Sequence, residues 1–175
     1  MPALSAVQSL IAASGDLPAR LSNQEVLLRL GAASLFGALV GFNRELHLKP
    51  AGIRTQALVA LGSATVTLVT ADLVLESGHP NVDAISRGMQ GVITGIGFLG
   101  AGAILRDRSG VQVHGLTTAA SVWISAALGL ACGAGLWRLA LIPLALAIGI
   151  LWLLEPLEAW IHRRNGTQAA PPPEP

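Results

Sequence analysis

The stretch RGMQGVITGIGFLGAGAIL, residues 87–105, decides the fold class, because after its first residue it contains no charged side chain. A helix needs about 20 mostly apolar residues to cross the hydrocarbon core of a bilayer, which is about 30 Å thick. The stretch has this length and is closed by the charged turn that begins at Arg106. It therefore predicts a membrane-spanning helix.

The composition of the whole chain supports the same class of protein. Of the 175 residues, 52% are hydrophobic and only 12% are charged, and the mean hydropathy is +0.60. These values leave too little polar surface to coat a soluble domain of this length. The formal net charge of +1, without a long basic run, argues against a nucleic-acid partner. The lipid bilayer is the expected partner, and the single cysteine, Cys132, has no second thiol for a disulfide.

Four more apolar stretches are bounded by charged or turn-forming residues in the same way. The five expected helices cover residues 25–42, 55–75, 87–105, 116–133 and 136–154. The predicted fold class is an all-α integral membrane protein, a bundle of about five transmembrane helices with small-residue packing faces. Residues 1–24 are expected to form an N-terminal lead, residues 25–155 the transmembrane domain, and residues 156–175 a proline-rich cytoplasmic tail.

The basic residues predict the orientation of the chain, because short loops rich in Lys and Arg stay in the cytoplasm. With five spans, seven of the 11 basic residues fall on one side, and they are Arg44, Lys49, Arg54, Arg106, Arg108, Arg163 and Arg164. We therefore expect the N-terminus outside and the C-terminus inside a bacterial inner membrane.

Glycines recur at spacings that place them on single helix faces. Lipid tails are as apolar as leucine, so helices in a bilayer associate through close contacts between small residues. The helix-packing candidates are Gly37, Gly41, Gly88, Gly91, Gly95, Gly102, Gly129 and Gly133. Because Gly97 and Gly100 add small residues on another side of the third helix, we expect this helix to be central in the bundle. Packing is the favoured role of these glycines over a direct role in ligand binding.

Hydroxyl side chains form two further stripes, Ser63, Thr67 and Thr70 on the second helix and Thr117, Ser121 and Ser125 on the fourth. Both stripes are expected to face protein. Such hydroxyls commonly bond to the preceding turn or to a neighbouring helix. The alternative is that they line a polar cavity that faces the third helix.

Charged residues near a membrane are functional candidates, although ion pairs across helix ends are also a common structural device. Asp72, Glu76 and Asp83 are candidates for weak magnesium binding at the outer face, since magnesium keeps several waters and prefers one or two carboxylates. The sequence shows no metal-ligand spacing, phosphate-binding loop or nucleophile with an oriented base. We therefore expect no catalytic residue, no bound metal and no cofactor.

Two segments resemble the signatures of the MgtC/SapB family of bacterial inner-membrane proteins. The first consists of GFNRE, residues 41–45, followed by KPAGIRT, residues 49–55. The second runs from Arg87 through Gln90 and TGIGFLGAG, residues 94–102, and resumes with GLTTAASVW, residues 115–123. The likeness covers residues 41–135 in order.

This resemblance implies a membrane domain of about five helices that takes part in adaptation to low magnesium and in virulence. The family is associated with survival in macrophages and with restraint of the proton-translocating ATP synthase, which makes that complex a candidate partner. The chain ends soon after the fifth expected helix, so it is similar to the short SapB-type members. The acidic residue of the second signature commonly lies three positions before the arginine, where this chain has Ala84, and Asp83 lies one residue earlier.

Charge and family motif together give one set of candidate functional residues. They are Arg44, Glu45, Lys49, Pro50, Arg54, Asp72, Asp83, Arg87, Gln90, Thr94, Thr117, Thr118 and Ser121. The leading hypothesis is a non-enzymatic regulator that acts through helix contacts, as a homodimer or with a membrane complex. The alternative is a transporter or channel-like protein for a cation or small solute, with the polar residues along its path.

Overall fold

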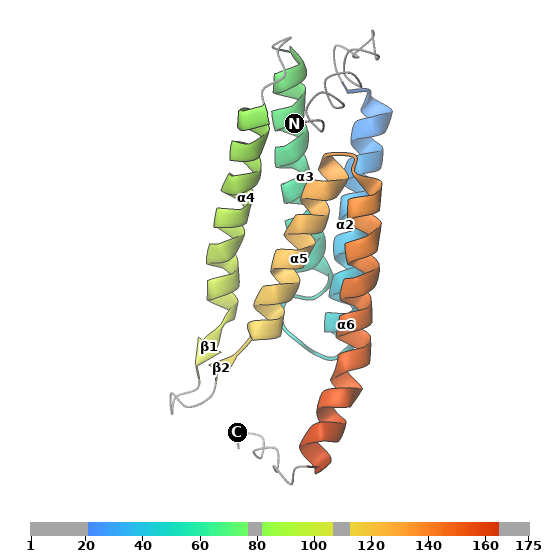
Figure 1. The fold of residues 1–175 in the computed structure, drawn as a ribbon, viewed down its shortest axis with the longest axis vertical. Helices are drawn as coiled ribbons and strands as arrows, with labels where there is room; N and C mark the ends of the chain where they lie inside the picture. Colours follow the sequence, from blue (N-terminus) through green and yellow to red (C-terminus); the bar gives the residue numbers. More distant parts are fainter. Residues whose placement is uncertain (1–20, 77–81, 107–112, 165–175) are drawn as a thin grey trace, which may run out of the picture.

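The computed structural model describes residues 21–76, 82–106 and 113–164. Within these ranges, five long helices run side by side and a short β-hairpin lies at one end (Figure 1). In chain order the elements are α2 (Asn23–Leu46), α3 (Ile53–Glu76), α4 (Val82–Ala103), β1 (Leu105–Arg106), β2 (Val113–His114), α5 (Leu116–Gly133) and α6 (Trp137–Arg164). The all-α membrane fold class is confirmed, and the hairpin is an addition that the sequence did not predict. Residues 1–20 of the expected lead and residues 165–175 of the expected tail lie outside the described residues.

Four of the described helices are long and apolar enough to cross a membrane by length and composition, and they are Asn23–Leu46, Ile53–Val74, Leu116–Gly133 and Trp137–Leu154. Helix α4 is not among them, because its glycines and its polar residues, such as Gln90, lower its hydropathy. Large apolar side chains lie on the outside of the bundle, as Leu27 and Phe98 do with 74% and 84% of their surface exposed. This arrangement suits a lipid environment, which solvates such side chains.

The helix bounds follow from local signals. Ser22 caps α2 by accepting a hydrogen bond from the Glu25 amide at 3.2 Å. Helix α5 covers the predicted residues 116–133 and ends in a Schellman motif, in which Gly135 has a φ of 72° and Leu136 N donates to Ala131 O at 2.9 Å. This motif makes the tight turn into α6.

The fifth helix is longer than predicted. We expected it to end at Leu154 and the tail to begin at residue 156, but α6 continues to Arg164. Proline removes a single backbone donor, and a helix tolerates it where the freed carbonyl finds another partner. Pro143 and Pro156 both lie inside α6, so proline does not end this helix.

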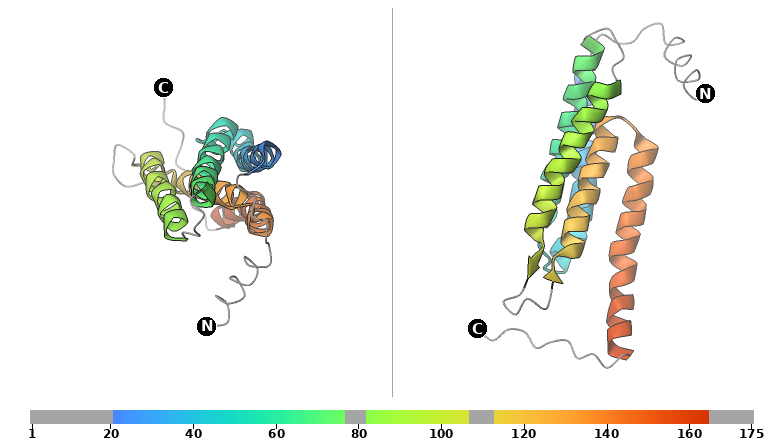
Figure 2. Two further views of the ribbon diagram at one scale, coloured as in Figure 1. Left: turned by 90° about the horizontal axis from the view of Figure 1, so that it is seen from above. Right: turned by 60° about the vertical axis from the view of Figure 1, so that its left-hand side comes forward.

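The third predicted helix, α4, is not central in the bundle. Helix α5 occupies that place, because it packs against α2, α3, α4 and α6 and has nine buried residues, whereas only Ile96 and Gly100 are buried on α4. Figure 2 shows α4 at one edge of the bundle, where it packs on α3 and α5. Glycines allow another helix to approach closely, but their presence on several sides of α4 does not mean that a helix packs on each of those sides.

Helix α3 lies against α2 and α5 with almost no space between the backbones. A Cβ atom at Gly37 of α2 would lie 2.4 Å from the Gln56 carbonyl oxygen, and one at Gly129 of α5 would lie 2.2 Å from the Ala60 carbonyl oxygen. Gly41 and Gly133 make similar approaches to the backbones at Ile53 and Ala64. We call these contacts the glycine seam. It is the packing by which small residues hold helices together in a bilayer.

The glycine seam predicts a strong effect of a single methyl group. Gly129→Ala is expected to lower the free energy of unfolding in mild detergent by about 1–3 kcal/mol, because the new Cβ overlaps backbone that has no room to move. The rate at which a thiol-reactive dye labels Cys132, the single and fully buried cysteine, reports unfolding as the temperature rises. Gly31→Ala is the matched control, since no atom lies within 4 Å of its Cβ position. Exposure of Cys132 at the same temperature in both variants would contradict the claim that the glycine seam stabilises the bundle.

Candidate functional site

The candidate site lies at the end of the bundle that carries the β-hairpin, which we call the hairpin end. The end of α2 and the beginnings of α3 and α5 meet there. Arg44 has 4% of its surface exposed, and its Nη2 donates to the Thr118 hydroxyl of α5. A buried guanidinium needs hydrogen-bonded partners to be stable in a medium of low polarity. The structure thus brings together two candidate residues that are 74 positions apart in the sequence.

A fully buried glutamine extends this polar cluster. Gln56 Nε2 donates to the Ser121 hydroxyl at 2.8 Å and to the Ala51 carbonyl at 3.2 Å. The Ser121 hydroxyl in turn donates to the Thr118 carbonyl at 2.8 Å. The bonds tie the α2–α3 loop, α3 and α5 together. We define Arg44, Gln56, Thr118 and Ser121 as the polar cluster.

The other motif residues at this end are exposed. Glu45 Oε2 accepts a hydrogen bond from the Ile53 amide at 3.3 Å, which places a carboxylate at the positive end of α3. Lys49, Pro50 and Arg54 lie around the same loop, with their side chains exposed. Glu45 therefore stabilises the start of α3, and the basic residues surround it.

The hydroxyl stripes differ from the prediction in one position. Thr118, Ser121 and Ser125 are buried against the bundle, whereas Thr117 is exposed. On α3, the Ser63 and Thr67 hydroxyls are buried and donate to carbonyls one turn earlier in their own helix, at 2.8 and 3.0 Å. Apart from Thr117, the stripes face protein, although Thr70 is only half-buried, and the α3 hydroxyls bond within their helix.

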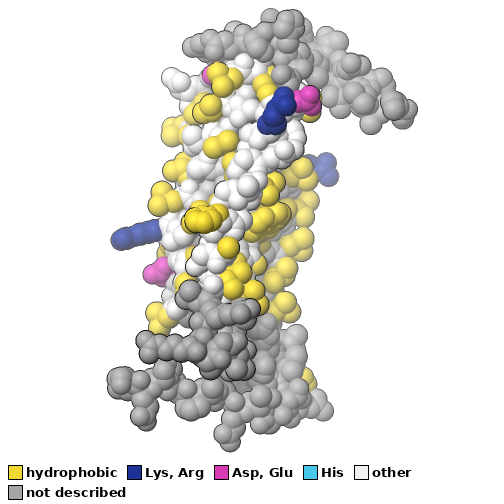
Figure 3. Space-filling model, turned by 90° about the vertical axis from the view of Figure 1, so that its left-hand side faces the viewer, with side chains coloured by type: hydrophobic (Ala, Val, Ile, Leu, Met, Phe, Trp, Pro, Cys, Tyr) yellow, Lys and Arg dark blue, Asp and Glu magenta, His cyan; other side chains and the backbone are white. Residues whose placement is uncertain are grey.

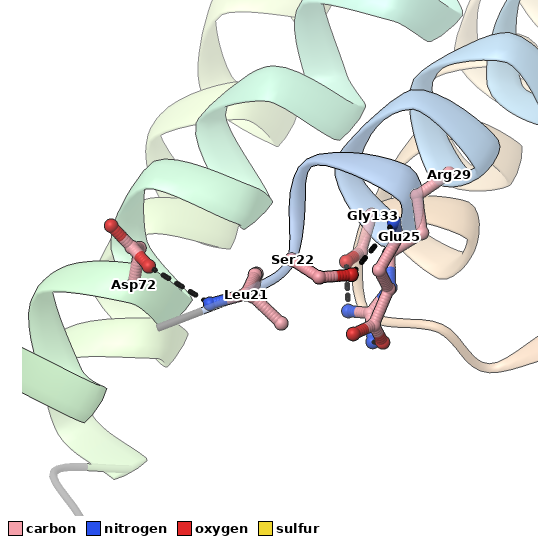
Figure 4. Close-up of polar contacts among 6 residues, drawn as sticks. All are labelled: Leu21, Ser22, Glu25, Arg29, Asp72 and Gly133. Carbon is pink, nitrogen blue, oxygen red and sulfur yellow. Dashed lines mark hydrogen bonds and ion pairs between the residues drawn. The ribbon is translucent and has the colours of Figure 1, made fainter. Parts of the chain in front are cut away.

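A second group of polar residues lies at the opposite end of the bundle (Figure 4). Arg29 pairs with Glu25 on α2, and its Nη1 donates to the Gly133 carbonyl at 2.9 Å. Because Gly133 ends α5, this bond joins the start of α2 to the end of α5. Asp72 accepts a hydrogen bond from the Leu21 amide at 3.5 Å.

The candidates on α4 remain apart from both groups. Asp83, Arg87, Gln90 and Thr94 have exposed side chains. Gln90 Nε2 donates to the Ser86 hydroxyl at 3.2 Å, and the Thr94 hydroxyl donates to the Gln90 carbonyl at 2.8 Å. Within the described part of the chain, no three His, Cys, Asp or Glu side chains come together to hold a metal ion. The Glu76 side chain, which belongs to the magnesium hypothesis, lies outside the described residues.

Two adjoining cavities lie beside α5. The hairpin-end cavity has a volume of about 690 Å³, and its polar wall includes Asn43, Arg44, Lys49, His114, Thr117 and Thr118. The α5–α6 cavity has a volume of about 580 Å³ and is lined mostly by apolar side chains, among them Trp123, Ile124 and Leu146. Both are within the size range of ligand pockets. They share Thr117, Ala120, Ile150 and Leu151 as walls.

Comparison with known proteins identifies the family of this chain. Residues 30–160 match the MgtC family. The chain belongs to the MgtC family. Protein SrpB of Synechococcus elongatus is 50% identical over 120 residues, which are 65% of this chain and 66% of that protein.

Two relatives of this MgtC-family chain carry the family name itself. Protein MgtC of Brucella abortus is 43% identical over 128 residues, 73% of this chain and 50% of the relative. Protein MgtC of Salmonella typhimurium is 44% identical over 115 residues, 66% of this chain and 46% of the relative. The chain thus spans about half the length of these two MgtC proteins. No solved structure matches it.

Three polar residues that the MgtC-family fold buries or ties down, Gln56, Asn43 and Arg29, are not among the candidates predicted from the sequence. Gln56 lies seven residues before Ser63 and therefore on the same face of α3, so this spacing could have predicted its burial. Asn43 is 3% exposed, and its Nδ2 has no hydrogen-bond partner among the described residues. Arg29 is one of the four basic residues on the expected outer side, and its partner on α5 is not visible in the sequence.

Arg29→Met tests the joint between α2 and α5. We expect the free energy of unfolding in detergent to fall by about 1.5–3 kcal/mol, the usual contribution of a hydrogen bond to a charged group. The measurement is again the thermal exposure of Cys132 to a thiol-reactive dye. The control is Glu25→Gln, which removes only the ion pair on the surface and should cost less than about 1 kcal/mol. An equal loss in both variants would show that the Gly133 bond contributes nothing.

Proposed function

We propose that this MgtC-family protein is a non-enzymatic regulator in the bacterial inner membrane that acts by docking α4 on the helices of a membrane partner. The observation that carries the proposal is the outer face of α4. No atom lies within 4 Å of a Cβ built at Gly91, Gly95 or Gly102. These three glycines share one side of the helix, since their spacings are four and seven.

The outer face of α4 suits protein better than lipid. Glycine bares the backbone, and Figure 3 shows pale areas of backbone and polar atoms among the hydrophobic side chains on the α4 side of the molecule. Gln90 and Thr94 add exposed polar groups on the same helix. A second helix that packs closely on these residues gains van der Waals contacts and hydrogen bonds that lipid tails do not provide.

The family resemblance indicates which process the protein regulates. Relatives at 43% and 44% identity are named Protein MgtC. By this resemblance, the protein acts in adaptation to low magnesium and in virulence, and the ATP synthase in the same membrane is a partner of fitting location. A second copy of the chain is the other partner that α4 fits, which would give a homodimer.

The basic residues support an orientation with the hairpin end in the cytoplasm. Arg44, Lys49 and Arg54 all lie at that end, whereas Arg29, Arg87 and Arg138 lie at the opposite end. Helix α6 begins at the opposite end and ends on the hairpin side with Arg163 and Arg164 (Figure 1). By the positive-inside rule, these residues support the proposal that the C-terminus is cytoplasmic.

Substitution of Gly95 tests the role of α4. In bacteria that depend on an MgtC-family protein for growth in low magnesium, Gly95→Leu should abolish growth, because the leucine side chain separates α4 from its partner. A photo-reactive residue at position 94 should crosslink to the partner in the wild-type background and lose this product with Gly95→Leu. Thermal exposure of Cys132 should be unchanged, since a Cβ atom at Gly95 would have no atom of the bundle within 4 Å.

Gly62→Leu is the matched control for Gly95→Leu, because Gly62 of α3 also has nothing within 4 Å and faces outward. The control should support growth like the wild type. Equal behaviour of the two variants would contradict docking through α4. Cation flux into proteoliposomes by the purified protein, abolished by Glu45→Ala or Asp72→Ala, would replace the proposal with the transporter hypothesis.

A further inference from the structure

The two adjoining cavities beside α5 differ in chemistry in a way that matches the two ends of one kind of molecule. Arg44, Lys49 and His114 are among the residues that line the hairpin-end cavity, and none of its described lining residues is acidic. The α5–α6 cavity contains only two polar side chains in its described wall, Thr117 and Ser121. A ligand that fills both cavities has an anionic head and an apolar tail.

The hairpin-end cavity offers hydrogen-bond donors as well as charge. Its wall contains the first turn of α5, from Leu116 to Thr118, and the first amides of a helix have no acceptors within the helix. The residue before them is Gly115, which has no side chain to cap them. The start of a helix also carries a partial positive charge that favours anions.

Asn43 is the second, independent feature that points to a ligand. It lines the same cavity, has 3% of its surface exposed, and its Nδ2 donor has no partner among the described residues. A buried donor without an acceptor is costly, and an oxygen of a bound anion removes this cost. A helix start, a buried amide and three basic side chains together form the donor set that suits a phosphate group.

We propose that the hairpin-end cavity binds the phosphate group of an anionic phospholipid, whose acyl chain lies in the α5–α6 cavity. The apolar walls decide between a lipid and a free phosphate. Ile150, Leu151 and Leu154 of α6 line the hairpin-end cavity, and a small hydrophilic ion gains nothing from them. An acyl chain that continues past Ile150 and Leu151 meets Trp123 and Leu146 in the next cavity.

Neither cavity wall contains Gly91, Gly95 or Gly102, so the test of the cavities uses other residues than the proposed docking face of α4. Trp123 lines the α5–α6 cavity and serves as the reporter. The other three tryptophans are removed by Trp137→Phe, Trp152→Phe and Trp160→Phe in the full chain. Phosphatidylglycerol with brominated acyl chains, added to the protein in detergent, should quench Trp123 fluorescence at lower concentration than phosphatidylcholine with the same chains.

Two pairs of variants test the head and tail positions separately. Lys49→Gln with His114→Gln should weaken quenching by brominated phosphatidylglycerol at least about fivefold, the effect of one basic charge near an anionic lipid. Arg54→Gln, which removes an exposed charge of the same end outside the cavity wall, should leave it unchanged. Ala147→Phe fills the α5–α6 cavity and should abolish quenching, whereas Ala145→Phe, outside that wall, should not.

Protection of Cys132 from a thiol-reactive dye shows that each variant is folded. Equal quenching by the two lipids, or the same affinity in the variants and their controls, would overturn the proposal. Inorganic phosphate is the third arm. Millimolar phosphate could protect the residues of the hairpin-end cavity from chemical labelling while neither lipid quenches Trp123. In that case the ligand is a free phosphate and the lipid proposal is wrong.

Discussion

The rest of the structure depends on the direct contact between the α3 backbone and the glycines of α2 and α5. In a bilayer there is no hydrophobic force to drive helices together, so the fit of their surfaces must do so. Gly37 and Gly129 approach α3 at the carbonyls of Gln56 and Ala60, which lie one turn apart, and leave no space even for a methyl group. The three helices α2, α3 and α5 therefore form a fixed unit, on which α4 and α6 pack from the outside.

The polar cluster follows from this contact. Because the glycine seam brings α2, α3 and α5 together, Arg44, Gln56 and Thr118 are buried at the point where the three helices meet. Each side chain finds a partner on another element, which a buried polar group in a membrane protein requires. The seam thus supplies both the adhesion of the helices and the buried position in which the arginine is held.

Residues 116–133 were predictable as α5 because glycines bracket an apolar run, and Gly115, with a φ of 89°, occupies a position that strongly favours glycine. The close contacts at Gly37 and Gly129 agree with their four-residue spacings to Gly41 and Gly133. The prediction that α4 is central in the bundle was wrong, because the sequence does not distinguish a glycine that packs against another helix from one on an open face. It was silent about Gln56, since its burial depends on Ser121, which is 65 residues away.

Helix α4 and the hairpin-end cavity, on which the two proposals rest, both adjoin the first turns of α5. Gly100 of α4 lies against Ala119, where an added Cβ would come within 3.7 Å, and the neighbouring residues Thr117 and Thr118 line the hairpin-end cavity. Thr118 also holds Arg44. A short segment therefore supports α4 on one side and the basic cavity on the other, while the seam below it is fixed. Ala103 of α4 is itself part of the cavity wall, so the contacts of α4 and the wall of the cavity share the first turns of α5.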